Sequence, residues 1–118
     1  MTKIERGMVI DINLDPTMGS ETGKVRPCVV VTNNVYNERV PVIQVVPITS
    51  WTTKKSRIKT NVELLPTQTS GLSKKSIADC LQTRPVDRRF RLVKVRGRLS
   101  SQNMSNIDHA LKTVLDLH

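Results

Sequence analysis

Pro27-Cys28-Val29-Val30-Val31-Thr32 is the stretch that decides the fold, because it holds four consecutive apolar side chains. A short, unbroken apolar run bounded by turn residues is typical of a strand that is covered on both faces. The sequence therefore predicts a central strand over this range.

The preceding segment predicts a second strand and a long loop. From Met8 to Leu14, the side chains of Ile10, Ile12 and Leu14 fall on one face of a strand, which we expect to be buried. Asp15–Lys24 then gathers proline, glycine, serine and threonine, a composition that favours an exposed loop. Long loops on small scaffolds often carry function.

Short segments rich in valine, isoleucine and leucine continue after the central run. They predict strands at Val42–Ile48, Asn61–Leu65, Ser76–Leu81 and Val93–Arg98. Pro47 lacks a backbone donor, so we expect it to mark an edge or a bulge. In the last strand Lys94, Arg96 and Arg98 alternate with valine and glycine, which predicts one basic face.

The C-terminal stretch changes to a helical period. Its apolar side chains recur on one side of a helix, at Met104, Ile107, Leu111, Val114 and Leu115. Ser100 or Ser101 is the expected N-cap. The sequence predicts a mainly β protein with a C-terminal helix, built as a small, bent antiparallel sheet or partly open barrel. We expect one domain over residues 1–118.

The charge balance points to a polyanionic partner. The 118 residues hold 19 Lys and Arg against 10 Asp and Glu, a formal net charge of +9. Such a surface attracts nucleic acid and binds it more weakly as salt rises. The alternative is that this charge only keeps a small protein in solution.

Cys28 and Cys80 each stand beside apolar residues, without the spacing of a metal or redox site, and we expect buried thiols in a reducing compartment. The N-terminus shows no secretory signal, and no apolar run is long enough to span a bilayer. The cytoplasm is the expected location.

Several short strings stand out along the chain: Arg6-Gly7, Leu14-Asp15-Pro16-Thr17, Gly19-Ser20-Glu21, Arg26-Pro27-Cys28-Val29-Val30-Val31, Pro47-Ile48-Thr49-Ser50 and Gln82-Thr83-Arg84-Pro85-Val86-Asp87. In their order and spacing they resemble the MazF/PemK toxins. The resemblance implies a small SH3-like barrel of the MazF/CcdB toxin type and a homodimer that binds single-stranded RNA in a groove. It further implies sequence-selective, ribosome-independent mRNA cleavage without a metal or other cofactor, through the 2′-hydroxyl. A partner antitoxin of the MazE kind is expected to cover the same groove with its C-terminal tail.

Arg26 and Thr49 are the predicted catalytic residues. A guanidinium is always charged and presents paired donors, so Arg26 suits the charge that develops on phosphoryl oxygens. Thr49 matches the threonine of the family, and its hydroxyl can position or stabilise the reacting phosphate. Without the resemblance, an arginine in surface ion pairs and a threonine in a turn would be the simpler interpretations.

Further residues are predicted to bind RNA through backbone approach, stacking or base-edge hydrogen bonds. These are Ser20, Glu21, Ser50, Trp51, Lys54, Gln82 and Arg84. Lys54 belongs to a basic set with Lys55, Arg57 and Lys59 that predicts a mobile loop along the phosphates. A solvated charged loop is the alternative for this set, an ordinary flexible loop for Gly19-Ser20-Glu21, and a core position for Trp51.

The sequence departs from the PemK branch. Ser20 stands where that branch has histidine, and Asp79 and Leu81 stand where it has arginine and aspartate. The acid/base set of PemK is therefore missing. His109 and His118 lie in the helix and at the chain end, so a two-histidine mechanism is not expected.

Two other functions compete with the endoribonuclease. A toxin of the same fold could poison DNA gyrase by protein contact, but it would have no need of Arg26, Thr49 and a basic segment. A basic barrel could also bind nucleic acid without chemistry, with salt-sensitive binding and no products.

Overall fold

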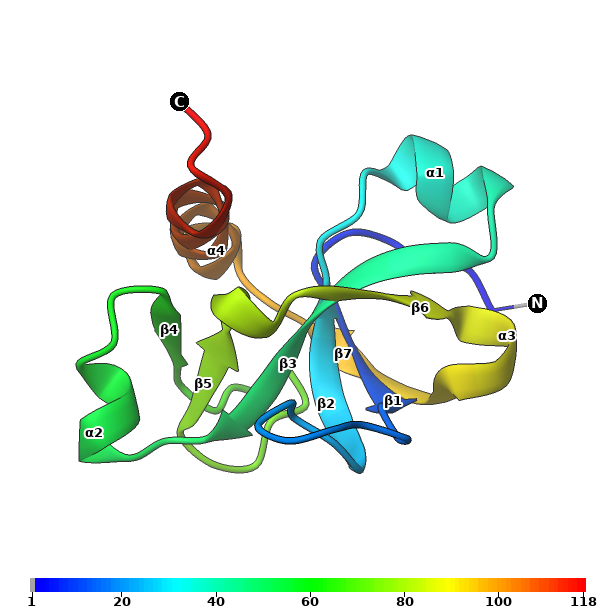
Figure 1. Cartoon of the computed structure of the whole chain (residues 1–118). Coiled ribbons are helices and arrows are strands. Elements are labelled where there is room, and N and C mark those ends of the chain that lie inside the picture. Colours follow the sequence, from blue (N-terminus) through cyan, green and yellow to red (C-terminus); the bar gives the residue numbers. More distant parts are fainter. Residues whose placement is uncertain (1) are drawn as a thin grey trace.

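The computed structural model describes residues 2–118, which form a curved antiparallel sheet with short helices at its ends and one long helix beside it (Figure 1). The sheet has the strand order β4-β5-β3-β2-β1-β7, and β6 pairs with β3 off this path. The strands are β1 (Met8–Asn13), β2 (Val25–Val30), β3 (Val42–Ser50), β4 (Asn61–Leu64), β5 (Ser76–Asp79), β6 (Arg84–Asp87) and β7 (Leu92–Arg98). This is the mainly β architecture with a C-terminal helix that the sequence predicts.

The central position of β2 is confirmed, since it pairs with β1 on one side and β3 on the other. Cys28, Val29 and Val30 are fully buried. Their alternation divides the core into two clusters, one around Val29 and one around Cys28 and Val30. Both faces of β1 are buried as well, because Val9 and Ile10 enter different clusters. The central strands are therefore covered on both sides.

β3 bends the sheet by changing its partner. Its first half, Val42 to Val45, pairs with β6, and its last residues, Ile48 to Ser50, pair with β5. Pro47 lies between these two ladders and opposite Cys28. Pro47 does not lie on an edge strand of the sheet, so that part of the expectation was wrong. It lies where pairing with β6 has ended and pairing with β5 has not begun, a local break at which the missing N–H interrupts neither ladder.

The long helix α4 (Ser101–Leu115) packs over β4 and over the short 3-10 helix η1 (Cys80–Gln82), as Figure 1 shows. Ser100 is its N-cap, and its hydroxyl oxygen accepts a hydrogen bond from the Asn103 amide. Met104, Ile107 and Ala110 are buried, whereas Leu115 is 56% exposed. Leu115 was thus assigned to the wrong side, because in the last turn of the helix it is Val114 that packs against the core.

Three short helices are absent from the sequence prediction. They are α1 (Asn34–Arg39), α2 (Thr53–Ser56) and α3 (Arg88–Arg91). α2 replaces the mobile loop expected for the basic residues after Thr49. Its N-cap Thr52 accepts a hydrogen bond from the Lys55 amide, which closes a single helical turn.

β7 is an edge strand, and its valine face is not buried: Val93 and Val95 are 57% and 40% exposed. The loop between β4 and β5 contacts the C-terminal end of β7, where the Arg98 amide donates to the Thr69 carbonyl at 2.7 Å. A methyl group on Gly97 would lie 2.2 Å from that carbonyl oxygen, and one on Gly71 would lie 2.4 Å from the Arg96 oxygen. Glycine is required at both positions.

Both cysteines are buried free thiols, as predicted. Within residues 2–118, no helix has the length and apolar character needed to cross a membrane.

Candidate active site

Arg26 and Thr49, far apart in the sequence, meet where β2 begins and β3 ends. The β2–β3 ladder ends with Cys28 opposite Pro47. Arg26 lies two residues before Cys28 and Thr49 two residues after Pro47, so in these antiparallel strands both residues lie beyond the same end of the ladder. Both side chains are half-buried. Together with Ser50 they line a cavity of about 240 Å³, so the two predicted catalytic residues lie at one opening.

The Arg26 side chain is held by the loop before its own strand. Its Nε donates a hydrogen bond to the Gly23 carbonyl at 2.9 Å. The two terminal NH₂ groups carry the other four donors of a guanidinium. Pro27 favours an extended backbone at Arg26, which continues the strand up to the loop. The arrangement provides a fixed cation with donors suited to an oxyanion.

Thr49 contacts a lysine that the sequence did not single out. Lys55 Nζ lies 3.3 Å from Thr49 Oγ1 and 3.3 Å from the Ser50 carbonyl oxygen. Lys55 is half-buried, whereas Lys54, the predicted RNA-binding residue of this segment, is exposed; neither lysine lines the cavity of Arg26 and Thr49. Because α2 is helical, neighbouring lysines point in different directions, and Lys55 is the one that returns to β3.

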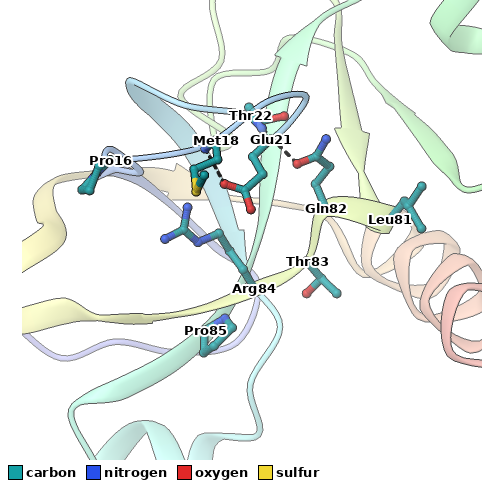
Figure 2. A pocket seen from close by; sticks show the side chains of 9 residues that line it. All are labelled: Pro16, Met18, Glu21, Thr22, Leu81, Gln82, Thr83, Arg84 and Pro85. Carbon is teal, nitrogen blue, oxygen red and sulfur yellow. Dashed lines mark hydrogen bonds between the residues drawn. The ribbon is translucent and has the colours of Figure 1, made fainter.

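A larger cavity of about 700 Å³ lies between the β1–β2 loop and β6. Figure 2 shows Glu21 and Met18 reaching down from the loop, with Gln82 and Arg84 facing them from η1 and β6. Met18 and Leu81 are 82% and 66% exposed, so this cavity has an apolar rim around polar groups. The predicted RNA-binding residues Glu21, Gln82 and Arg84 therefore come together, at a cavity separate from that of Arg26 and Thr49.

Hydrogen bonds within the chain occupy these side chains. Gln82 Nε2 donates to the Ser20 carbonyl at 3.0 Å, while Gln82 Oε1 accepts from the Thr22 amide at 2.9 Å. Glu21 Oε1 accepts from the Met18 amide at 2.7 Å, and Arg84 Nη1 donates to the Leu14 carbonyl at 3.0 Å.

The shared effect of these bonds is to shape the β1–β2 loop. To read a base, Gln82 would have to release the hydrogen bonds that its amide oxygen and its NH₂ group make to the loop. Ser20 is exposed and contributes its backbone carbonyl to this network.

Trp51 is half-buried, so it is not a core residue. Its Nε1 donates to Glu63 Oε2 at 3.2 Å, and Lys75 Nζ sits 4.2 Å from the ring centroid. Lys75 also pairs with Glu63 at 3.1 Å, and its hydrogen bond is the main cause that lowers the pKa of Glu63. One face of the indole therefore carries an ammonium, and a base could stack only on the other face.

Two further cations were missed as site residues. Lys74 and Arg96 line the smaller cavity with Arg26 and Thr49. Arg96 is fixed by Asp11, a buried carboxylate whose Oδ1 accepts from Arg96 Nε at 2.6 Å. The alternating basic residues of β7 were the available signal for Arg96. They did not indicate which of the three would reach the cavity.

The other titratable groups near the site are few. Asp79, at the end of β5, is half-buried, and burial raises its pKa, while the positive charge of Lys55 acts in the opposite direction. His109 and His118 are exposed and line neither cavity. Over residues 2–118, no three His, Cys, Asp or Glu side chains gather as a metal site would require.

Comparison with known proteins agrees with this arrangement. Residues 5–115 match the family described as "PemK-like, MazF-like toxin of type II toxin-antitoxin system". The chain is 36% identical to endoribonuclease MazF9 of Mycobacterium tuberculosis over 119 aligned residues, which cover 97% of this chain and 98% of that protein.

Solved structures share the fold at lower identity. MazF of Deinococcus radiodurans superposes with a TM-score of 0.84 at 22% identity, over 99% of this chain and 100% of that one. A mycobacterial endoribonuclease in complex with its cognate antitoxin gives a TM-score of 0.75 at 22% identity, over 96% and 95% of the two chains. With the match over residues 5–115 and the MazF9 identity, the chain belongs to the PemK-like, MazF-like toxins of type II toxin-antitoxin systems.

Proposed function

We propose that this toxin is an endoribonuclease that cleaves single-stranded mRNA at selected sequences, independently of the ribosome and without a metal. The observation that carries the proposal is that Arg26 and Thr49 line one cavity, where a guanidinium and a hydroxyl can face the same phosphate. The 36% identity to a protein named as an endoribonuclease supports it.

In the proposed reaction the 2′-oxygen bonds to the adjacent phosphorus and the bond from phosphorus to the 5′-oxygen breaks. A general base takes the 2′ proton and a general acid returns one to the 5′-oxygen, which leaves a cyclic phosphate and a free 5′-hydroxyl. The terminal NH₂ groups of Arg26 stabilise the charge on the phosphoryl oxygens, and Thr49 positions the phosphate. These roles use donors that the site already holds in place.

The larger cavity is the proposed place for bases next to the cut. Its apolar rim suits an unstacked base, and the polar groups of Glu21 and Arg84 lie below it. Ser20, Ser50, Trp51, Lys54 and Gln82 complete the proposed RNA-binding set. The net charge of +9 supports a polyanionic substrate.

We further propose that the toxin is a homodimer, that it acts in the cytoplasm, and that an antitoxin with a C-terminal tail inhibits it by covering the RNA groove. A structure of the fold described as MazE-MazF from D. radiodurans, with a TM-score of 0.77, supports the antitoxin proposal. Inhibition follows if the tail and RNA compete for the same groove.

The test is cleavage of single-stranded RNA by the purified protein in EDTA. We expect products with cyclic phosphate and 5′-hydroxyl ends, and we expect Arg26→Ala to lower the rate at least about a hundredfold, as loss of an oxyanion donor does. Arg26→Ala should keep the wild-type circular dichroism spectrum. Full cleavage by this variant would remove Arg26 from the mechanism.

The same assay separates the competing functions. Intact RNA with stalled gyrase would favour a gyrase poison, for which the family match and relatives give no support. Salt-sensitive RNA binding without products would indicate a binding protein. Mapping the 5′ ends of the fragments also identifies the cleavage sequence.

A further inference from the structure

Lys55 is the charged side chain that touches Thr49. Its Nζ lies 3.3 Å from both Thr49 Oγ1 and the Ser50 carbonyl oxygen, so the ammonium bridges the hydroxyl and the backbone at the end of β3. The positive charge of Lys55 also acts on Asp79 from β5. Lys55 therefore faces the strand ends that carry the proposed site.

The main chain around Lys55 is anchored on both sides. The Lys55 amide donates to the Thr52 hydroxyl at 3.1 Å, and Asn61 Nδ2 donates to the Lys55 carbonyl at 3.0 Å. α2 is thus tied to its own N-cap and to the start of β4. With the backbone fixed and the side chain half-buried, the ammonium has a defined place beside Thr49.

We propose that Lys55 is a positioning residue that sets the direction of the Thr49 hydroxyl. An ammonium has three donors and no acceptor, whereas a threonine hydroxyl has one donor and two acceptor lone pairs. In the contact between them Lys55 must donate and Thr49 Oγ1 must accept. The single Thr49 proton is then left for a different acceptor.

This inference rests on the proposed function and assigns Thr49 a definite part in it. The Thr49 O–H donates a hydrogen bond to a non-bridging oxygen of the scissile phosphate, where negative charge develops. An oxygen that already accepts from an ammonium is a poor base, so Thr49 does not take the 2′ proton. Lys55 and Thr49 exchange no proton with the RNA.

The experiment measures single-turnover cleavage and RNA affinity for a set of full-length variants. K55M removes the donor and the charge, and K55R keeps a charged donor. K112M is the matched control, because it removes the same charge from an exposed position on α4. T49V and the T49V/K55M double variant complete a mutant cycle, and thermal unfolding checks that each variant folds.

We expect K55M to lower the cleavage rate constant about tenfold or more at saturating enzyme, with K55R within about threefold of wild type. K112M should match wild type. T49V/K55M should be no slower than T49V alone, since Lys55 acts through the hydroxyl that T49V removes.

Three results would overturn the inference: K55M cleaves as fast as K112M, K55M weakens only RNA affinity, or the losses in T49V and K55M multiply in the double variant. If K55M does not fold, a K55R rate as low as that of T49V overturns it too. A wild-type protein that leaves RNA intact refutes the proposed function itself, and the inference with it.

Discussion

The Cys28 thiol lies buried in the central strand β2. Burial raises its pKa to about 12, and the negative charge of Asp11 adds to the effect. Burial likewise raises the pKa of Cys80 to about 12. Both thiols therefore stay protonated in the native protein at pH values where they ionise in an unfolded chain.

The free energy of unfolding should fall with rising pH because of these thiols. Between the ordinary pKa of 9.0 and the native value of about 12, the unfolded chain has lost the Cys28 proton and the native chain has kept it. This stabilisation is fully present below pH 9. Between pH 9 and about 12, the free energy of unfolding falls by about 1.4 kcal/mol per pH unit for each thiol.

Urea unfolding of the wild type and Cys28→Ala at pH 8 to 10.5 measures this effect. The two proteins differ only at Cys28, so the difference between their curves isolates this thiol. The variant should be less stable at pH 8 and lose stability less steeply as pH rises. Parallel curves would mean that Cys28 ionises alike in both states.

Arg26 and Thr49 show what the sequence can tell about single residues. Their motifs predicted both as site residues, and in the structure both line the smaller cavity. Lys55 was not separated from Lys54, because a helical turn was not foreseen there and its phase decides which lysine turns inward. Arg96 depended on a contact with Asp11, which lies 85 residues away in the chain. Local sequence patterns do not show which residues so far apart along the chain come into contact.

At the scale of elements, the β1–β2 loop depends on one side chain of η1. Gln82 bonds to Ser20 and Thr22 with both ends of its amide. We expect Gln82→Leu to free this loop and to raise the amide hydrogen exchange rate of Thr22 about tenfold or more, since a broken hydrogen bond of about 1.4 kcal/mol corresponds to that factor.

Gln82→Glu provides the matched control. A carboxylate can still accept from the Thr22 amide but cannot donate to the Ser20 carbonyl. Exchange at Thr22 should therefore stay near the wild-type rate in Gln82→Glu and rise only in Gln82→Leu. Equal exchange in all three proteins would show that the loop holds its shape without Gln82.

The strands with apolar residues were predictable, including the four-residue β4 and β5, whereas the short helices were not. β1, β2 and α4 have the alternation, apolar run or helical period that a buried face imposes. α2 and α3 span four residues each, too few for a helical period to appear. β6 is polar apart from Pro85 and Val86, and pairing with β3 rather than its own sequence makes it a strand.

At the scale of the whole molecule, the charge of +9 should govern RNA affinity. Affinity for a non-cleavable 2′-O-methyl RNA should fall linearly with the logarithm of salt concentration. If Lys54 contacts a phosphate, Lys54→Met should reduce the slope by about 0.7, the value for one contact with a single strand. Filter binding at salt concentrations from about 50 to about 300 mM measures this slope.

Lys112→Met is again the control, because it lowers the net charge of the protein by the same amount as Lys54→Met. Its slope should equal that of the wild type. A reduction as large as that of Lys54→Met would mean that RNA senses the net charge of the toxin rather than a contact on α2.

The closure of β7 by the β4–β5 loop bears on how this protein avoids edge-to-edge aggregation. An open edge strand offers unpaired backbone groups to any other strand, and valines such as Val93 and Val95 would favour aggregation there. The loop shields part of that edge only because Gly71 and Gly97 leave room for direct backbone contact. These two glycines, which have no side chain, thus protect the toxin from fibre growth through strand pairing at this edge.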